Sequence, residues 1–361
     1  RHIVAGRAFQ GFDEADQAGE RRPQFVADIC DEIDAHLLSP ADRGQVLQDN
    51  DNRLAAGAAA AQPRTVTDDT GREVAIPSVP ERIVALHEPL LTLPLLEIGM
   101  PVVGSYGRSD DGESLLALDF IETVLGDDAR KLGIGGIGPL GNIDLERIRA
   151  LKPDLIVGTE HDREKAELLS AIAPVYLQNS RSGVVSGFEA EAALADVFDR
   201  RSAFEAKKAN YLDRVAQVKD DLPGAPDEET YLAIIIYDQI NVVSAMSGAI
   251  QAIEDLGYSR AEWQGGGKAA GYGSGFAVPL SSEAFGRLDP DVLVVMNSYS
   301  SGERDEAAIR ERLDLIVPGW DRFLKPARED RIVFLDSGKA ATPTIASAQH
   351  TLDAFEAWAR D

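Results

Sequence analysis

Aromatic and charged side chains follow the predicted strands of this sequence, where a bound molecule could be held. In open α/β sheets, ligands bind outside the carboxyl ends of the strands. Aromatic faces combined with a few cations suit a rigid, partly apolar ligand, so we predict a binding site at these positions. The candidate ligand-binding residues are His87, Glu88, Tyr106, Arg108, Glu160, His161, Arg181, Tyr237, Trp263, Lys268, Tyr272, Phe276 and Tyr299.

A repeated motif indicates that the strands belong to two similar lobes. The stretch E-R-I-R-A-L-K-P-D-L-I-V from Glu146 returns as E-A-F-G-R-L-D-P-D-V-L-V from Glu283, with Glu, Leu, Pro and Asp in register. Each copy predicts a short helix that stops at Pro-Asp and leads into a buried strand. The expected fold class is therefore α/β, with two similar lobes and mostly parallel sheets.

The predicted boundaries divide the chain into four parts. They are an N-terminal helical extension or linker (1–62), a first lobe (63–185), a connecting helix (186–222) and a second lobe (223–361). No Pro or Gly occurs from Phe188 to Leu222, which predicts one helix of about 36 residues and about 54 Å. A kink near Arg200 would give two helices instead. Residues 115–125 are also expected to be helical.

Composition excludes several classes of function. The net charge is -25, which argues against a general affinity for nucleic acids or anionic membranes. Cys30 is the only cysteine, so no internal disulfide can form, and Ile29 before it does not suit lipoprotein processing. The sequence shows neither a signal peptide nor the roughly 18 apolar residues of a membrane span. If the protein is exported, this sequence is a processed form.

Taken in order, these pieces resemble the substrate-binding proteins of ABC transporters that capture ferric siderophores, haem and cobalamin. The resemblance covers about residues 65–360. It rests on T-V-T-D-D-T-G-R-E-V-A-I-P, P-E-R-I-V-A-L-H, the two repeated units and the long helix. It implies two α/β lobes bridged by one long rigid helix, with the ligand cleft between the lobes.

The function implied by this resemblance is capture of a ferric siderophore and its delivery to the membrane permease of an ABC importer. Haem and cobalamin are the alternative ligands within the same fold. The resemblance further implies an extracytoplasmic monomer, periplasmic or attached to the cell surface, that catalyses no reaction. No cofactor is expected, and the ligand would be an Fe(III) chelate. The strongly negative chain favours a neutral or cationic hydroxamate complex over an anionic one.

Individual roles can be assigned on the same basis. In the family, one glutamate on each lobe pairs with permease arginines, and Glu146 and Glu283 occupy these positions. The alternative is an exposed residue in a first helical turn, favoured by the helix dipole. Arg108 and Arg181 would meet an anionic shell of the chelate, while Tyr106, Trp263 and Tyr299 would pack on its carbon skeleton. His87 is either a hydrogen-bonded structural residue or a ligand to the iron.

A glycine motif offers a remote alternative from another class, an NAD-dependent oxidoreductase. Gly133–Gly138, G-I-G-G-I-G, matches the G-x-G-x-x-G of dinucleotide-binding proteins. That motif functions only between a strand and the helix that it opens. The preceding D-D-A-R-K-L is a poor strand, and Pro139 follows at once. A surface adhesion or sensory module built from the same lobes is a third alternative.

Overall fold

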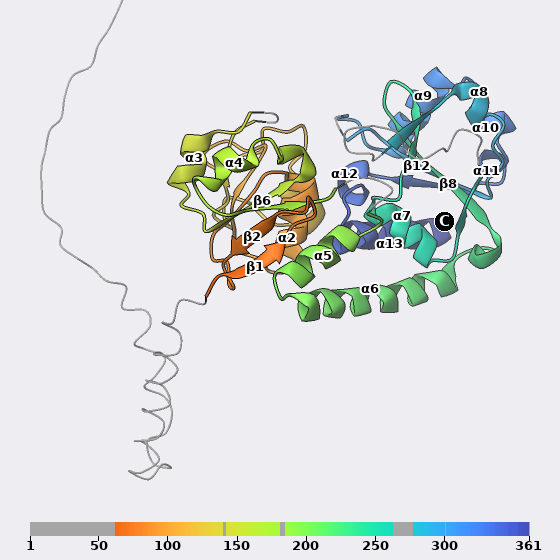
Figure 1. The fold of residues 1–361 in the computed structure, drawn as a ribbon. Coiled ribbons are helices and arrows are strands. Elements are labelled where there is room, and N and C mark those ends of the chain that lie inside the picture. The colour runs from red at the N-terminus through yellow and green to blue at the C-terminus, as the bar shows by residue number, and fades with distance from the viewer. Residues whose placement is uncertain (1–61, 140–141, 181–184, 263–276, 300, 361) are drawn as a thin grey trace, which may run out of the picture. The chain divides into compact units, whose positions relative to one another are not determined.

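The computed structural model describes residues 62–139, 142–180, 185–262, 277–299 and 301–360 (Figure 1). They belong to one compact unit, which begins at Ala61. The predictions made for residues 1–62, apart from the last of them, and for Arg181, Trp263, Lys268, Tyr272 and Phe276 lie outside the described residues. In the described part of the chain, no helix has both the length and the apolar composition needed to cross a membrane.

The first lobe contains a parallel sheet of five strands in the order β5-β4-β3-β6-β7. Its central strands are buried on both faces, which accounts for their unbroken apolar sequences. The strands are β3 (Ile83–Ala85), β4 (Val102–Ser105), β5 (Gly135–Gly136), β6 (Leu155–Thr159) and β7 (Val175–Gln178). The helices are η1 (Glu88–Thr92), α2 (Leu93–Glu97), η2 (Ile121–Leu125), α3 (Leu145–Ala150), η3 (Glu160–Asp162) and α4 (Ala166–Ser170).

A hairpin of β1 (Arg64–Thr67) and β2 (Glu73–Ile76) precedes this sheet, as the sequence predicts. The Asp68 carboxylate accepts hydrogen bonds from the backbone N–H groups of Thr70 and Arg72 and so holds the turn. The Asp69 N–H donates to the Leu177 carbonyl at 3.1 Å, which fixes the hairpin to β7.

The second lobe contains a mixed sheet in the order β11-β9-β8-β12-β13, with β10 also paired to β8. Its strands are β8 (Thr230–Ile236), β9 (Ile240–Val243), β10 (Ser259–Arg260), β11 (Ala277–Leu280), β12 (Val292–Met296) and β13 (Ile332–Leu335). Strands β8, β12 and β13 are parallel, whereas β9 and β11 run antiparallel to their neighbours. The helices are η4 (Pro226–Glu228), α7 (Gly248–Asp255), α8 (Ser282–Phe285), α9 (Glu306–Ile316), α10 (Trp320–Phe323), α11 (Lys325–Arg328), α12 (Ser337–Ala340) and α13 (Ile345–Arg360).

The connection between the two sheets is two helices, α5 (Glu189–Val197) and α6 (Arg201–Asp221). The prediction of a single helix of about 36 residues is therefore wrong, and the alternative with a break near Arg200 is correct. The chain bends because Asp199 has a left-handed φ of 54° while Phe198 turns inward, its ring 6.2 Å from that of Tyr176 in β7. Beyond the break, α6 runs alongside α13 and α7 (Figure 1).

The repeated Pro-Asp motif has the same structure in both lobes. In each copy a short helix, α3 or α8, leads into a buried strand, β6 or β12. The Asp154 carboxylate accepts hydrogen bonds from the backbone N–H groups of Glu81 and Arg82 just before β3. The Asp291 carboxylate accepts from the backbone N–H and hydroxyl of Thr230, the first residue of β8. Both aspartates thus align the strand that they begin with its parallel neighbour.

The predicted helix over 115–125 is wrong for its first half. Only Ile121–Leu125 is helical, and residues 115–119 form an irregular segment. Its Asp119 carboxylate points to the interior and binds the Arg108 guanidinium, a contact that a surface helix would not provide.

Candidate functional site

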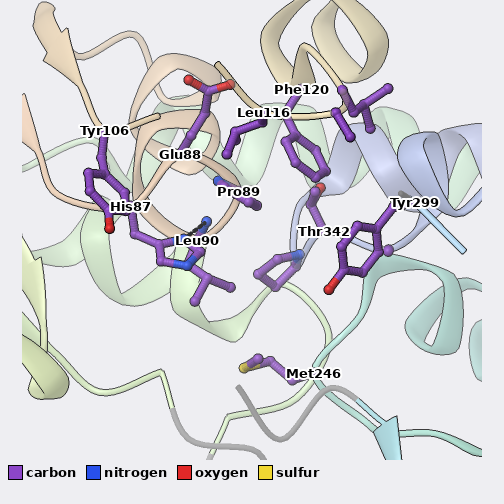
Figure 2. A pocket seen from close by; sticks show the side chains of 14 residues that line it. His87, Glu88, Pro89, Leu90, Tyr106, Leu116, Phe120, Met246, Tyr299 and Thr342 are labelled. Carbon is purple, nitrogen blue, oxygen red and sulfur yellow. Dashed lines mark hydrogen bonds between the residues drawn. The ribbon is translucent and has the colours of Figure 1, made fainter. Parts of the chain in front are cut away.

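A cavity of about 250 Å³ lies where segments of both lobes meet (Figure 2). On the first lobe its lining follows β3 and β4 and includes the 116–120 segment. On the second lobe it follows β9 and β12 and includes the turn before α13. The lining residues are His87, Glu88, Pro89, Leu90, Tyr106, Leu116, Ala117, Leu118, Phe120, Met246, Tyr299, Ala341, Thr342 and Pro343. Four of the predicted site residues, His87, Glu88, Tyr106 and Tyr299, are thus brought together by the fold.

His87 contributes a neutral imidazole to this cavity. Its Nδ1 accepts a hydrogen bond from the Leu90 N–H at 3.3 Å, which caps η1 (Figure 2). Burial lowers the pKa of His87 to about 4, and the opposing effect of Asp162 does not compensate. The proton of the neutral ring therefore resides on Nε2, so the residue presents a hydrogen-bond donor rather than a positive charge.

Glu88 lines the cavity but directs its carboxylate away from it, behind the lining (Figure 2). Its two oxygens accept hydrogen bonds from Nε and Nη2 of Arg108, at 2.7 and 2.9 Å. The Ser105 hydroxyl donates to the same carboxylate at 3.1 Å. Burial raises the pKa of Glu88, and the adjacent Arg108 guanidinium opposes that rise.

The expected contact of Arg108 with an anionic ligand is corrected by the structure. Its side chain is 0% exposed, and it lies behind the cavity wall rather than on it. Besides Glu88, it binds Asp119 and the Gly112 carbonyl. The positive charge is thus shared between two carboxylates inside the protein. A strand-end arginine resembles a ligand contact in sequence, because the carboxylates that bind it cannot be recognised there.

The other predicted site residues lie apart from this cavity. Glu160 accepts hydrogen bonds from the backbone N–H and hydroxyl of Ser180, and His161 lies beside it, largely exposed. Tyr237 lines a neighbouring polar hollow at the carboxyl ends of β8 and β12. Its ring meets that of Tyr299 edge to face at 5.9 Å, so the two tyrosines stand between the polar hollow and the cavity.

Several residues that line the cavity were not predicted. Leu116, Leu118, Phe120, Met246 and Thr342 are apolar or weakly polar, and they occupy positions where the sequence suggests only core or loop. Thr342 precedes α13, and its carbonyl accepts a hydrogen bond from the Gly248 N–H. No local signal marks these residues, because their role depends on how the two lobes pack together.

Comparison with known families identifies the chain at this point. The sequence profile of the family described as "Periplasmic binding protein" matches residues 123–337, more than half of the chain. The protein belongs to the periplasmic binding protein family. No curated protein sequence matches it.

Solved structures of similar fold agree with this assignment of the periplasmic binding protein fold. Holo-ViuP is 21% identical, with a TM-score of 0.64, and the match covers 81% of this chain and 94% of ViuP. Staphylococcus aureus SirA, complexed with staphyloferrin B, is 18% identical with a TM-score of 0.58, covering 81% and 96%. The siderophore-binding protein BauB, bound to acinetobactin and ferric iron, is 21% identical with a TM-score of 0.55, covering 82% and 99%.

A periplasmic binding protein is a receptor, not an enzyme, and the glycine motif agrees with that role. Gly135–Gly136 is the edge strand β5, paired with β4, and α3 begins only at Leu145. A Cβ atom at Gly136 would lie 1.9 Å from the Arg108 carbonyl oxygen, so close backbone packing explains the glycine. The dinucleotide-binding alternative is therefore wrong: no helix begins directly after the motif to bind a pyrophosphate.

The two glutamates of the repeated motif stand on the surface of this binding protein. Glu146 and Glu283 lie in the first turns of α3 and α8, with side chains 83% and 75% exposed. Each pairs with an arginine of its own helix, Arg149 at 2.7 Å and Arg287 at 2.5 Å. Such exposed pairs contribute little to stability, so both carboxylates can be transferred to another partner at low cost.

Proposed function

We propose that this periplasmic binding protein captures a ferric siderophore outside the cytoplasm and delivers it to the permease of an ABC importer. The observation that carries the proposal is the cavity between the lobes, with its apolar walls and its tyrosines. Such a surface suits the carbon skeleton of an iron chelate. SirA with staphyloferrin B and BauB with its ferric acinetobactin complex have the same fold and support the ligand class.

The ligand that fits this cavity best is a chelate without strong negative charge, such as a ferric hydroxamate. In the described part of the lining, Glu88 is the one residue that carries a charge at neutral pH, and Arg108 neutralises it. His87 is uncharged there. An anionic chelate would therefore lose its hydration without meeting a compensating cation on these walls. A neutral chelate carries a smaller desolvation cost.

Isothermal titration calorimetry tests the proposal with a panel that varies ligand charge. The panel contains a neutral ferric hydroxamate, a ferric catecholate, ferric citrate, haem and cobalamin, with NADH as the negative control. Submicromolar binding of the hydroxamate, weaker binding of the anionic chelates and no heat from NADH would support it. Tightest binding of the catecholate would overturn the charge argument, and tightest binding of haem or cobalamin would replace the ligand class.

A further inference from the structure

One wall of the cavity is held from behind by a single buried side chain. All five N–H bonds of the Arg108 guanidinium are used: two on Glu88, two on Asp119 and one on the Gly112 carbonyl. The distances lie between 2.5 and 2.9 Å. Planar two-point contacts of this kind fix the direction of a carboxylate as well as its position.

The partners of Arg108 are the ends of the segments that form the cavity wall. Glu88 begins η1, whose Pro89 and Leu90 line the cavity. Gly112 and Asp119 flank the irregular segment that places Leu116, Leu118 and Phe120 on the opposite side.

Few other bonds hold that irregular segment. Its Leu115 N–H donates to the Gly107 carbonyl, and the Ser114 hydroxyl donates to the Leu118 carbonyl. Leu118 reaches the second lobe, because a Cβ atom at Gly338 in α12 would lie 2.7 Å from its methyl group. The position of the segment therefore affects both the cavity and the contact with α12.

We propose that Arg108 is a positioning residue that sets the width of the ligand cavity through Asp119 and Gly112. This inference rests on the proposed function, in that the cavity is taken as the ligand site. The guanidinium touches no ligand, and its two carboxylate partners cancel its charge. It shapes the wall for every ligand of suitable size and does not discriminate by ligand charge.

Asp119 is the residue at which this role can be tested. It does not line the cavity, and its side chain is 27% exposed, so its replacement leaves the Glu88–Arg108 pair intact. Asp119 also accepts a hydrogen bond from the Glu122 N–H at the start of η2. Asp119→Ser keeps such a cap but cannot reach the guanidinium, whereas Asp119→Asn keeps the cap and one contact with Arg108.

The matched control is Asp128→Ser. Asp128 faces the same outer hollow as Asp119, is 30% exposed and caps the backbone N–H of Arg130, but does not contact Arg108. Affinities for a neutral and an anionic ferric chelate are measured by calorimetry for each variant. We expect Asp119→Ser to weaken both by about ten-fold, Asp119→Asn to lie between it and the native protein, and Asp128→Ser to change neither.

The opposite role predicts the opposite sign. If Arg108 contacts the ligand, removal of Asp119 leaves its charge less compensated, and the anionic chelate binds more tightly. That result, or unchanged affinity for both chelates, would overturn the proposal. Hydrogen–deuterium exchange without ligand gives an independent readout: exchange in residues 112–122 should accelerate in Asp119→Ser while the two sheets stay protected. If no chelate binds the native protein, the proposed function fails, and the exchange experiment still decides whether Arg108 holds this wall.

Discussion

Glu97 of α2 and Glu191 of α5 accept hydrogen bonds from consecutive backbone N–H groups at the start of α13. Glu191 Oε2 binds the Ile345 N–H at 3.1 Å, and Glu97 Oε2 binds the Ala346 N–H at 3.2 Å. Both carboxyls are buried, and Lys207 reaches only Glu97, at 3.6 Å. The turn just before α13 lines the cavity, so this pair anchors a part of the site.

The first prediction concerns the pH dependence of stability. Burial and the adjacent Glu97 raise the pKa of Glu191 well above its usual range, so the folded protein binds this proton more tightly than the unfolded chain. The resulting stabilisation is complete below the unfolded pKa and is lost as pH rises through the folded pKa. Between about pH 5 and 8, native stability should fall by up to about 1.4 kcal/mol per pH unit from this group.

Glu191→Gln should remove this dependence, because the amide keeps an acceptor for Ile345 and does not titrate. Thermal unfolding over the same pH range measures the difference. Glu205→Gln on the exposed face of α6 is the control and should follow the native curve. Parallel curves for the native protein and Glu191→Gln would show that the carboxyl carries no extra proton when folded.

The second prediction separates ligand capture from delivery. Glu146→Gln with Glu283→Gln should leave ligand affinity unchanged and abolish uptake by cells, since neither side chain approaches the cavity. The control pair, Glu167→Gln with Glu306→Gln, replaces two other exposed first-turn glutamates, one of which also pairs with an arginine of its own helix. Calorimetry and uptake of radioactive iron give the two readouts. Normal uptake by the first pair, or equal loss in both pairs, would contradict permease docking by these residues.

Much of the fold follows from local rules that the sequence displays. Pro-Asp stops a helix and begins a buried strand in both lobes, so the α3–β6 and α8–β12 units were predictable from the repeat. The two-helix connection was predictable only as an alternative. Its break depends on Phe198 packing against Tyr176, a contact between residues distant in sequence.

The site was predictable only where strand ends define it. His87 and Tyr106 follow β3 and β4, and the rule that ligands bind at the carboxyl ends of strands places them correctly. Arg108 follows the same rule and is nevertheless internal, because Asp119 lies in a segment that looks helical in sequence. Apolar residues such as Met246 carry no sign of their role, which depends on the packing of one lobe against the other.

The third prediction concerns His87 at acidic pH. Its folded pKa of about 4 lies below the ordinary 6.5, so neutral His87 stabilises the fold above pH 6.5, and this contribution is lost as pH falls toward 4. Full loss corresponds to at most about 3 kcal/mol. His87→Asn, which keeps a capping acceptor for Leu90, should unfold with less dependence on acid. Exposed His161→Asn should behave like the native protein, and an identical acid response in all three would contradict the assignment.

The fourth prediction concerns the two aspartates of the repeat. The Lys325 ammonium and the Thr230 N–H lower the pKa of Asp291 to about 2, so its contribution is present above its ordinary pKa and is lost as pH falls toward 2. Asp291→Ala should cost about 2 kcal/mol at neutral pH, because it leaves the start of β8 without its acceptor. Asp154→Ala lacks a lysine partner of this kind and should cost less. Urea unfolding at neutral pH measures both variants, and a larger loss in Asp154→Ala would show that Lys325 does not account for the difference between the lobes.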